Sequence, residues 1–99
     1  AYQPVTKPAP PTVKNRAWPR TAIDQFILAK LEEKGMNPAP DATKEALLRR
    51  ATYDLTGLPP TPQEIQAFAA DTTPQAFAKV VDRLLASPAY GDVMAMRVT

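Results

Sequence analysis

Residues 49–64 read RRATYDLTGLPPTPQE, and this stretch predicts where one helix ends and the next begins. Gly57 follows apolar residues at helical spacing, and glycine is the residue that most often ends a helix in a left-handed turn. Pro59 and Pro60 cannot continue the helix, because proline lacks the backbone donor. Thr61-Pro62-Gln63-Glu64 then supplies a capping residue, a proline at the first helical position and a reciprocating glutamate. The stretch therefore predicts two helices joined by a short turn.

Five residues of this stretch are predicted to hold the turn together. Asp54 lies near the C-terminal end of its helix, where a negative charge is unfavourable. We expect Arg50, four residues earlier on the same face, and the N–H groups of the turn to compensate for it. A ligand or metal role for Asp54 is the alternative. The structural set is Arg50, Asp54, Gly57, Thr61 and Glu64.

The helix before the turn is expected to begin at Asp41 or Thr43, and Leu58 is expected to fold back toward Tyr53 in a Schellman-type ending. The helix after the turn is short and ends near Asp71. Their inward residues are predicted to be Leu47, Leu48, Ala51 and Leu55 for the first helix, and Ile65 and Phe68 for the second.

Two further helices flank this pair. Thr21 and Asp24 predict the start of the first, and Gly35 its end, with Met36 placed against Leu31. The other is predicted to open at Thr73-Pro74 and to close at Ser87-Pro88. Their apolar faces are expected to be Ile23, Phe26, Ile27 and Leu31 in the first, and Phe77, Val80, Val81, Leu84 and Leu85 in the second.

No segment alternates between apolar and polar residues, so no sheet is predicted. The fold class is therefore all-α, a small bundle of about four short helices behind an extended proline-rich arm. The predicted divisions are an extended basic arm over residues 1–20, a helical domain over residues 21–91 and a divergent or truncated tail over residues 92–99.

The arm carries five of the twelve prolines, four basic residues and no acidic one. Prolines favour extended backbone, so we expect no helix and little packing within the arm. Such a segment lies over its own domain or over a partner, or stays disordered without one. Trp18 could equally cover the bundle's own core. The predicted partner-binding residues are Tyr2, Pro4, Arg16, Trp18 and Arg20.

The composition removes most catalytic chemistry. The 99 residues contain no cysteine and no histidine, so disulfides, thiolate chemistry, c-type haem attachment and histidine-based acid–base catalysis are excluded. Glu32 and Glu33 are adjacent and point in different directions on a helix, so they are not expected to form a catalytic pair. No catalytic, cofactor-binding or metal-binding residue is predicted. The chain is also predicted to have no transmembrane segment of its own.

The run from Asp54 to Glu64, D-L-T-G-L-P-P-T-P-x-E, resembles a planctomycete-type cytochrome-c-associated domain of unknown function found in large exported proteins. The resemblance extends to Trp18-Pro19-Arg20, to the segment 82–91 and to the opening Tyr2-Gln3-Pro4-Val5. It implies an exported, periplasmic setting near electron transfer, and it implies no haem in this chain. After Tyr90-Gly91 the family continues with a helix rich in Trp, Arg and His. The chain differs there, so it is expected to be truncated or to be a short relative.

The sequence-based hypothesis is a non-catalytic accessory module that docks on a larger exported or membrane-bound redox assembly, with a protein partner and no nucleic acid. The alternative is the N-terminal fragment of a multidomain exported redox or hydrolytic enzyme, whose active groups lie outside this chain. Nucleic-acid binding is disfavoured because the arm offers one tryptophan and four charges, too few for a stacking platform.

Overall fold

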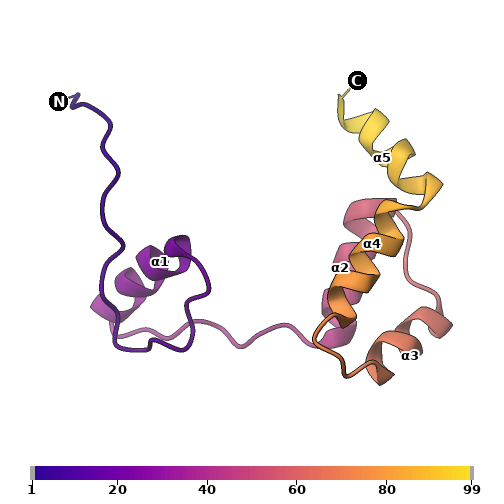
Figure 1. Ribbon diagram of the computed structural model, residues 1–99, viewed down its shortest axis with the longest axis horizontal. Coiled ribbons are helices and arrows are strands. Elements are labelled where there is room, and N and C mark those ends of the chain that lie inside the picture. Colours follow the sequence, from indigo (N-terminus) through magenta and orange to yellow (C-terminus); the bar gives the residue numbers. More distant parts are fainter. Residues whose placement is uncertain (1, 99) are drawn as a thin grey trace. The chain divides into compact units, whose positions relative to one another are not determined.

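The computed structural model describes residues 2–98, so the first residue of the predicted arm and the last of the predicted tail lie outside it. The described residues form helices and no strand, which confirms the all-α class (Figure 1). The chain divides into two compact units between Pro40 and Asp41, and each is described by itself. The five helices are α1 (Ala22–Glu33), α2 (Lys44–Thr56), α3 (Pro62–Ala70), α4 (Ala76–Leu85) and α5 (Pro88–Val98).

Helix α1 of the first unit begins and ends as the sequence predicts. The Thr21 hydroxyl accepts the backbone N–H of Asp24 at 3.3 Å. At the other end, Gly35 adopts a left-handed φ of 66°. The N–H of Gly35 donates to the carbonyl of Glu32 at 3.0 Å, and that of Met36 donates to Leu31 at 2.8 Å. These two bonds form a Schellman motif.

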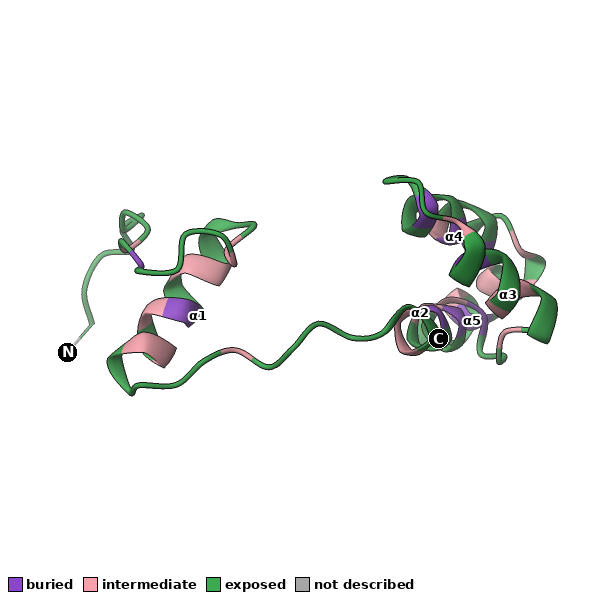
Figure 2. Ribbon diagram, turned by 90° about the horizontal axis from the view of Figure 1, so that it is seen from below, coloured by how far each residue is buried: buried purple, intermediate pink, exposed green. Residues whose placement is uncertain are grey.

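The apolar face predicted for α1 was largely wrong. Leu28 is the buried residue of the helix, 1% exposed, whereas Ile23 and Ile27 are 70% and 50% exposed. Figure 2 shows a single short buried band on α1, among intermediate and exposed residues. The proline-rich segment packs on the face that carries Leu28, so this face is the buried one. Helical periodicity alone does not tell which side of a helix a neighbouring segment will cover.

The predicted arm consists of two different parts. Residues 2–10 are exposed and have no regular structure. The following residues, up to Arg20, return over α1, and Val13 is buried there, 7% exposed. The arm has no helix, as expected, but its second half packs on α1 more closely than its proline content predicts.

Helix α2 is the centre of the second unit, and α3, α4 and α5 all pack against it. Leu48 is fully buried on α2. Around it lies one apolar core, to which Ala51, Leu55 and Ile65 add partly buried side chains. The expected faces of α2 to α4 are therefore right in most positions, although Phe77 and Leu85 stay 37% and 42% exposed. The buried members of the core are Leu48, Phe68, Ala76, Val80 and Leu84.

Two threonines also face the interior from α2, which the apolar pattern did not predict. The hydroxyl of Thr52 donates to the carbonyl of Leu48, and that of Thr56 donates to Thr52, both at 2.7 Å. A buried hydroxyl is costly without a partner, and the preceding helical turn supplies one here. Threonine is thereby compatible with an inward position.

The C-terminal end of α2 differs in one detail from the prediction. Gly57 is left-handed, φ 72°, and its N–H donates to the carbonyl of Tyr53 at 2.9 Å. This single bond is the simpler αL ending rather than the Schellman motif. The Leu58 N–H donates to the Thr56 hydroxyl at 3.3 Å instead of to a helix carbonyl. The predicted helix end was therefore right, and its hydrogen-bond pattern was wrong.

Helix α3 begins as predicted. The Thr61 hydroxyl accepts the N–H of Glu64 at 3.2 Å, while the Glu64 carboxylate accepts the N–H of Thr61 at 2.9 Å. Helix α4 does not begin at the expected cap, because the hydroxyl of Thr73 donates to the Asp71 carboxylate at 2.7 Å. Its N-cap is Gln75, which makes no side-chain capping bond.

The fifth helix corrects the predicted number of helices. Residues 92–98 belong to α5, which starts at Pro88 and packs on α2. Val93 is buried at this contact, 8% exposed. Near the end of α5, the guanidinium of Arg97 donates to the backbone carbonyl of Asp54 at 2.9 Å. Residues 92–98 are thus part of the second unit's packing.

Candidate partner-binding site

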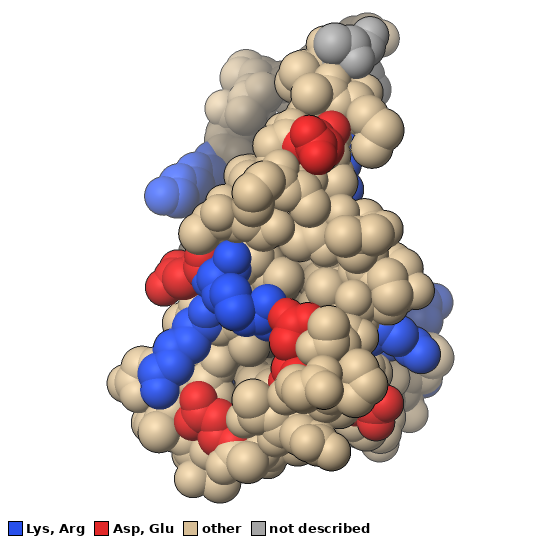
Figure 3. Space-filling model, turned by 90° about the vertical axis from the view of Figure 1, so that its right-hand side faces the viewer, with Lys and Arg blue, Asp and Glu red and all other residues tan. Residues whose placement is uncertain are grey.

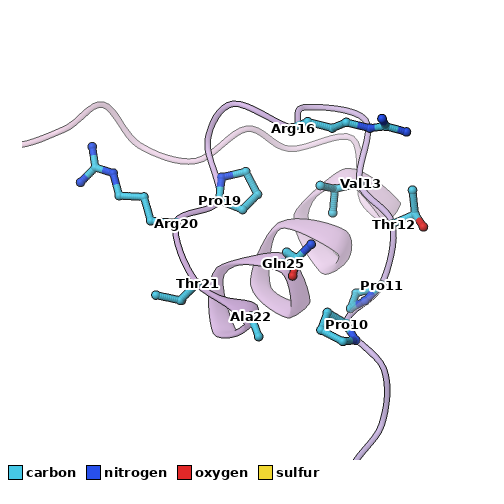
Figure 4. A pocket seen from close by; sticks show the side chains of 10 residues that line it. All are labelled: Pro10, Pro11, Thr12, Val13, Arg16, Pro19, Arg20, Thr21, Ala22 and Gln25. Atoms are coloured by element: carbon cyan, nitrogen blue, oxygen red, sulfur yellow. The ribbon is translucent and has the colours of Figure 1, made fainter.

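The second half of the arm and the N-terminal half of α1 line an open hollow of about 500 Å³ in the first unit (Figure 4). We call this the arm–α1 hollow. Its walls come from the arm, where Pro10, Pro11 and Pro19 place three rigid rings around it. Its base comes from α1, where Gln25 lies in the middle, with the arm residues around it. The volume falls within the range of ligand-binding pockets.

The arm is held in place by one carboxylate of α1. The backbone N–H of Lys14 donates to Oε1 of Glu32 at 2.9 Å, and that of Asn15 donates to Oε2 at 3.1 Å. These two bonds form what we call the Glu32 clasp. They lower the pKa of Glu32, the Lys14 bond contributing most, because both stabilise the ionised carboxylate.

Two local turns shape the rest of the arm. The side-chain oxygen of Asn15 accepts the N–H of Ala17 at 3.1 Å and that of Trp18 at 3.3 Å. Asn commonly forms such turns with the backbone that follows it. Further along, the Arg20 N–H donates to the Asp24 carboxylate at 2.9 Å. The arm is therefore attached to α1 on both sides of the hollow.

Arg16 and Arg20, two of the five predicted partner-binding residues, line the hollow. Both side chains are exposed, and Figure 4 shows them at opposite edges with their guanidinium groups directed outward. No acidic residue lines the hollow. The Arg16 side chain forms no hydrogen bond or ion pair within residues 2–98. Arg16 therefore presents an exposed basic group at one edge of the hollow.

The other three predicted residues lie elsewhere in the first unit. Tyr2 and Pro4 belong to the exposed part of the arm, and Tyr2 is fully exposed, 108%. Trp18 is half-buried and does not line the hollow. The structure thus brings together only the arginines of the set, and the role of all five residues stays a prediction.

Sequence reasoning missed two residues of α1 that build this site, Gln25 and Glu32. In the sequence Glu32 stands out only as one half of an acidic pair, yet it shapes the arm. A signal was available: Gln25, Leu28 and Glu32 recur every three or four residues, which places them on one helical face. A polar residue on each side of a buried leucine is a pattern suited to hold a neighbouring backbone.

The opposite face of α1 is apolar and uncovered within the first unit. Ile23, Phe26 and Ile27 are spaced as neighbours on one side of the helix, and their exposed fractions are 70%, 40% and 50%. We call them the α1 apolar face. Single exposed apolar residues need no explanation, whereas a contiguous group of this kind is typical of an interaction surface.

A second hollow, of about 380 Å³, lies between α3 and α4 of the second unit. Its apolar base includes Phe68 and Val80. Two ion pairs connect the helices across it, Glu64 with Arg83, and Asp71 with Lys79 at 3.5 Å. Figure 3 shows acidic and basic side chains adjoining one another on this side of the molecule. The rim is therefore charged, and each of these charges has a partner of opposite sign.

The pKa values of both acidic rim residues are lowered. For Glu64 the main cause is the hydrogen bond from the Thr61 N–H, followed by the Thr61 hydroxyl and Arg83. For Asp71 it is the Thr73 side chain, followed by the Thr73 N–H and Lys79. These partners belong to helix caps and interhelical pairs, so the lowered pKa values reflect structural roles rather than acid–base catalysis.

The structure places the five predicted turn residues as follows. Gly57, Thr61 and Glu64 form the end of α2 and the capping box of α3. Arg50 and Asp54 form no ion pair within the described part of the chain. The positive charge at this end of α2 comes instead from Arg97 of α5.

Groups of metal-ligating side chains and helices fit to span a bilayer are both absent from residues 2–98. The Asp and Glu side chains there form no group of three that could hold a metal ion. None of the helices described combines the length and the apolar content that crossing a bilayer requires.

The comparisons with known proteins identify one family. Residues 22–99 match the model of PSCyt2, described as a protein of unknown function (DUF1549). No curated protein matches the chain, and no solved structure does. The family match agrees with the resemblance based on the run from Asp54 to Glu64. The chain therefore belongs to the PSCyt2 family of proteins of unknown function.

Proposed function

We propose that the chain is a non-catalytic interaction module that binds a protein partner within a larger exported or membrane-bound redox assembly. The observation that carries the proposal is the α1 apolar face, Ile23, Phe26 and Ile27, which stays exposed in the first unit. In this proposal the chain supplies no catalytic group or cofactor. Its setting is periplasmic, as the cytochrome-c-associated resemblance implies.

The energetics favour the α1 apolar face as the main contact. Complete burial of an Ile or Phe side chain contributes about 1.5–3 kcal/mol. The three residues are about half exposed, so covering them adds roughly 1 kcal/mol each. A total of roughly 3 kcal/mol corresponds to about a hundredfold in affinity. The fully exposed Tyr2 adds an aromatic anchor of the type enriched at interfaces.

Site-specific photo-cross-linking tests this proposal. A photoreactive phenylalanine analogue replaces Phe26, and a matched variant carries it at Gln66, an exposed position of α3. Each protein is incubated with the membrane and periplasmic fractions of the source cells, and the products are identified by haem staining and mass spectrometry. We expect position 26, and not position 66, to cross-link to a subunit of a haem-bearing assembly.

Two outcomes would contradict the proposal. One is the absence of any product at position 26, and the other is the same set of products from both positions, which would indicate non-specific contact. The intact mass of the natively purified protein addresses the alternative function. A mass far above 10.8 kDa would favour the fragment of a multidomain enzyme.

A further inference from the structure

Residues 2–10, which we call the exposed arm, present their backbone and side chains to the surroundings. All nine are exposed, and Tyr2 and Val5 are fully so, at 108% and 101%. None of the nine forms a hydrogen bond or an ion pair within residues 2–98. The segment continues into the part of the arm that is held against α1, where Val13 is buried (Figure 1). The exposed arm therefore extends from an anchored base, with its groups available to a partner.

The prolines of the exposed arm favour a polyproline II backbone. Proline fixes φ near about −65°, close to the polyproline II value of about −75° and far from the values of about −120° to −140° of a β-strand. The residue before a proline is also restricted to extended backbone. Six of the nine residues are constrained in one of these two ways: Gln3, Pro4, Lys7, Pro8, Ala9 and Pro10.

A polyproline II backbone sorts the side chains of the exposed arm into three ridges. It has three residues per turn, so residues three apart share a ridge and recur about every 9 Å along it. One ridge is apolar, one is a mixture of proline and lysine, and one is polar or small. In that order the ridges are Tyr2, Val5 and Pro8; Pro4, Lys7 and Pro10; and Gln3, Thr6 and Ala9.

The backbone of the exposed arm restricts the chemistry of its partner. Its three prolines carry a carbonyl but no N–H, so acceptors outnumber donors. A complementary surface supplies hydrogen-bond donors beside apolar area, and Trp and Tyr combine an apolar ring with an N–H or O–H group. An anionic membrane surface presents phosphate oxygens, which are acceptors and complement only Lys7. The exposed arm therefore favours a protein surface rich in aromatic side chains, as in other polyproline II complexes.

We propose that the exposed arm binds as a polyproline II segment in a groove of the protein partner that is lined by Trp or Tyr side chains. The apolar ridge enters the groove and the polar or small ridge faces away from it. Because the prolines already fix much of the backbone, binding costs less conformational freedom than it would for a flexible segment. The inference rests on the proposed function for the existence of a protein partner, and it names the surface that this partner presents.

Site-specific photo-cross-linking with the full chain tests the inference. The experiment with Phe26 is repeated with the photoreactive analogue at one position at a time, namely Tyr2, Gln3, Val5 and Thr6. We expect strong cross-links to one protein subunit at positions 2 and 5, and weak ones at positions 3 and 6. A bound β-strand would instead group position 3 with position 5 and position 2 with position 6, because its side chains alternate between two faces.

Competition measures how much each ridge contributes. Unlabelled full chain, wild type or variant, competes with the photoreactive chain for the product at position 5. Val5→Ala should compete about tenfold less well, because most of an apolar side chain is lost from the groove. The matched variant Thr6→Ala, on the ridge that faces away, should stay within about twofold. Ala9→Pro removes a backbone N–H and keeps the polyproline II backbone, so it should compete at least as well as the wild type.

Several results would overturn the inference. They are cross-links grouped at positions 3 and 5, equal yields or no product at all four positions, products on lipid in place of protein, and weaker competition by Ala9→Pro than by the wild type. Any of these together with a positive cross-link at position 26 would refute the polyproline II contact and leave the proposed function intact. Products at positions 2 and 5 without one at position 26 would support the polyproline II contact and contradict the α1 apolar face as the binding surface.

Discussion

The guanidinium of Arg97 donates to the backbone carbonyl of Asp54 at 2.9 Å, across 43 residues of sequence. This carbonyl lies at the C-terminal end of α2, whose last turn contains no basic residue of its own. The carbonyl end of a helix carries partial negative charge, and Asp54 adds a full one. Arg97 therefore supplies from α5 the positive charge that the sequence suggested Arg50 would provide.

Replacing Arg97 is expected to loosen α5 from α2. Arg97→Met keeps the helix propensity and removes the donor and the charge, so the free energy of unfolding of the second unit falls by about 1 kcal/mol. Urea denaturation followed by circular dichroism measures it. The matched variant Arg50→Met has no such bond to lose and stays within about 0.5 kcal/mol of the wild type. Equal losses of unfolding free energy in both variants would show that the loss comes from removing a positive charge and not from losing the contact with Asp54.

The Glu32 clasp predicts a local effect of a single substitution. Glu32→Gln leaves one oxygen to accept the two N–H groups of Lys14 and Asn15 and removes the charge that strengthens both bonds. Amide hydrogen exchange at Lys14 and Asn15, measured by NMR, should become several times faster. Glu33→Gln is the control, because within residues 2–98 Glu33 pairs only with the exposed Lys30, at 3.2 Å. Unchanged exchange in Glu32→Gln would rule out a clasp.

The same carboxylate predicts how the arm responds to pH. The hydrogen bonds from Lys14 and then Asn15 lower the pKa of Glu32 below its ordinary value of 4.5. Its contribution to holding the arm is therefore complete above pH 4.5 and is lost as the pH falls through the lowered pKa. We expect the Lys14 and Asn15 amide resonances to titrate together in that acidic range in the wild type, and to show no such step in Glu32→Gln. A step near or above pH 4.5 would contradict the lowered pKa.

Helix ends marked by a glycine or by a capping box proved the most predictable part of this fold. The stop signals at Gly35 and Gly57 and the capping box of Thr61 and Glu64 depend on neighbouring residues alone, so a single sequence contains all that determines them. The start of α5 was not predicted, because its signal was interpreted only as the end of α4. Ser87-Pro88 predicts the end of α4, yet the Ser87 hydroxyl also accepts the N–H of Ala89 at 3.2 Å, beside a proline in the first helical position.

The candidate site was less predictable, because it depends on which face of α1 the arm covers. Charge alone points to Arg16 and Arg20. Glu32 and Gln25 acquire their roles only when residues 11–20 return across the helix, and periodicity cannot supply that contact. Because the arm covers this face of α1, Leu28 is buried while Ile23 and Ile27 stay exposed.

Two substitutions test which face of α1 is buried. Leu28→Ala removes a side chain that is 1% exposed, and such core truncations cost about 2–5 kcal/mol. A unit of this size has little stability to spare, so we expect α1 to lose most of its amide protection. Ile27→Ala, at a position 50% exposed, should change the stability by less than about 0.5 kcal/mol. A larger loss of stability in Ile27→Ala than in Leu28→Ala would mean that the apolar face predicted from periodicity is the buried one.

Two glycines of the second unit are expected to respond in opposite directions to the same substitution. Gly57 has a φ of 72°, and a Cβ there would lie 3.5 Å from Val93 Cγ2, an ordinary contact. Gly57→Ala should therefore destabilise by about 1–2 kcal/mol through its left-handed backbone and not through a clash. Gly91 lies inside α5, where an added Cβ would meet nothing within 4 Å, so Gly91→Ala should stabilise by about 0.5–1 kcal/mol. Differential scanning calorimetry measures both shifts. A loss of stability in Gly91→Ala would mean that α5 is not helical at that position, and a neutral Gly57→Ala would mean that α2 does not end in a left-handed turn.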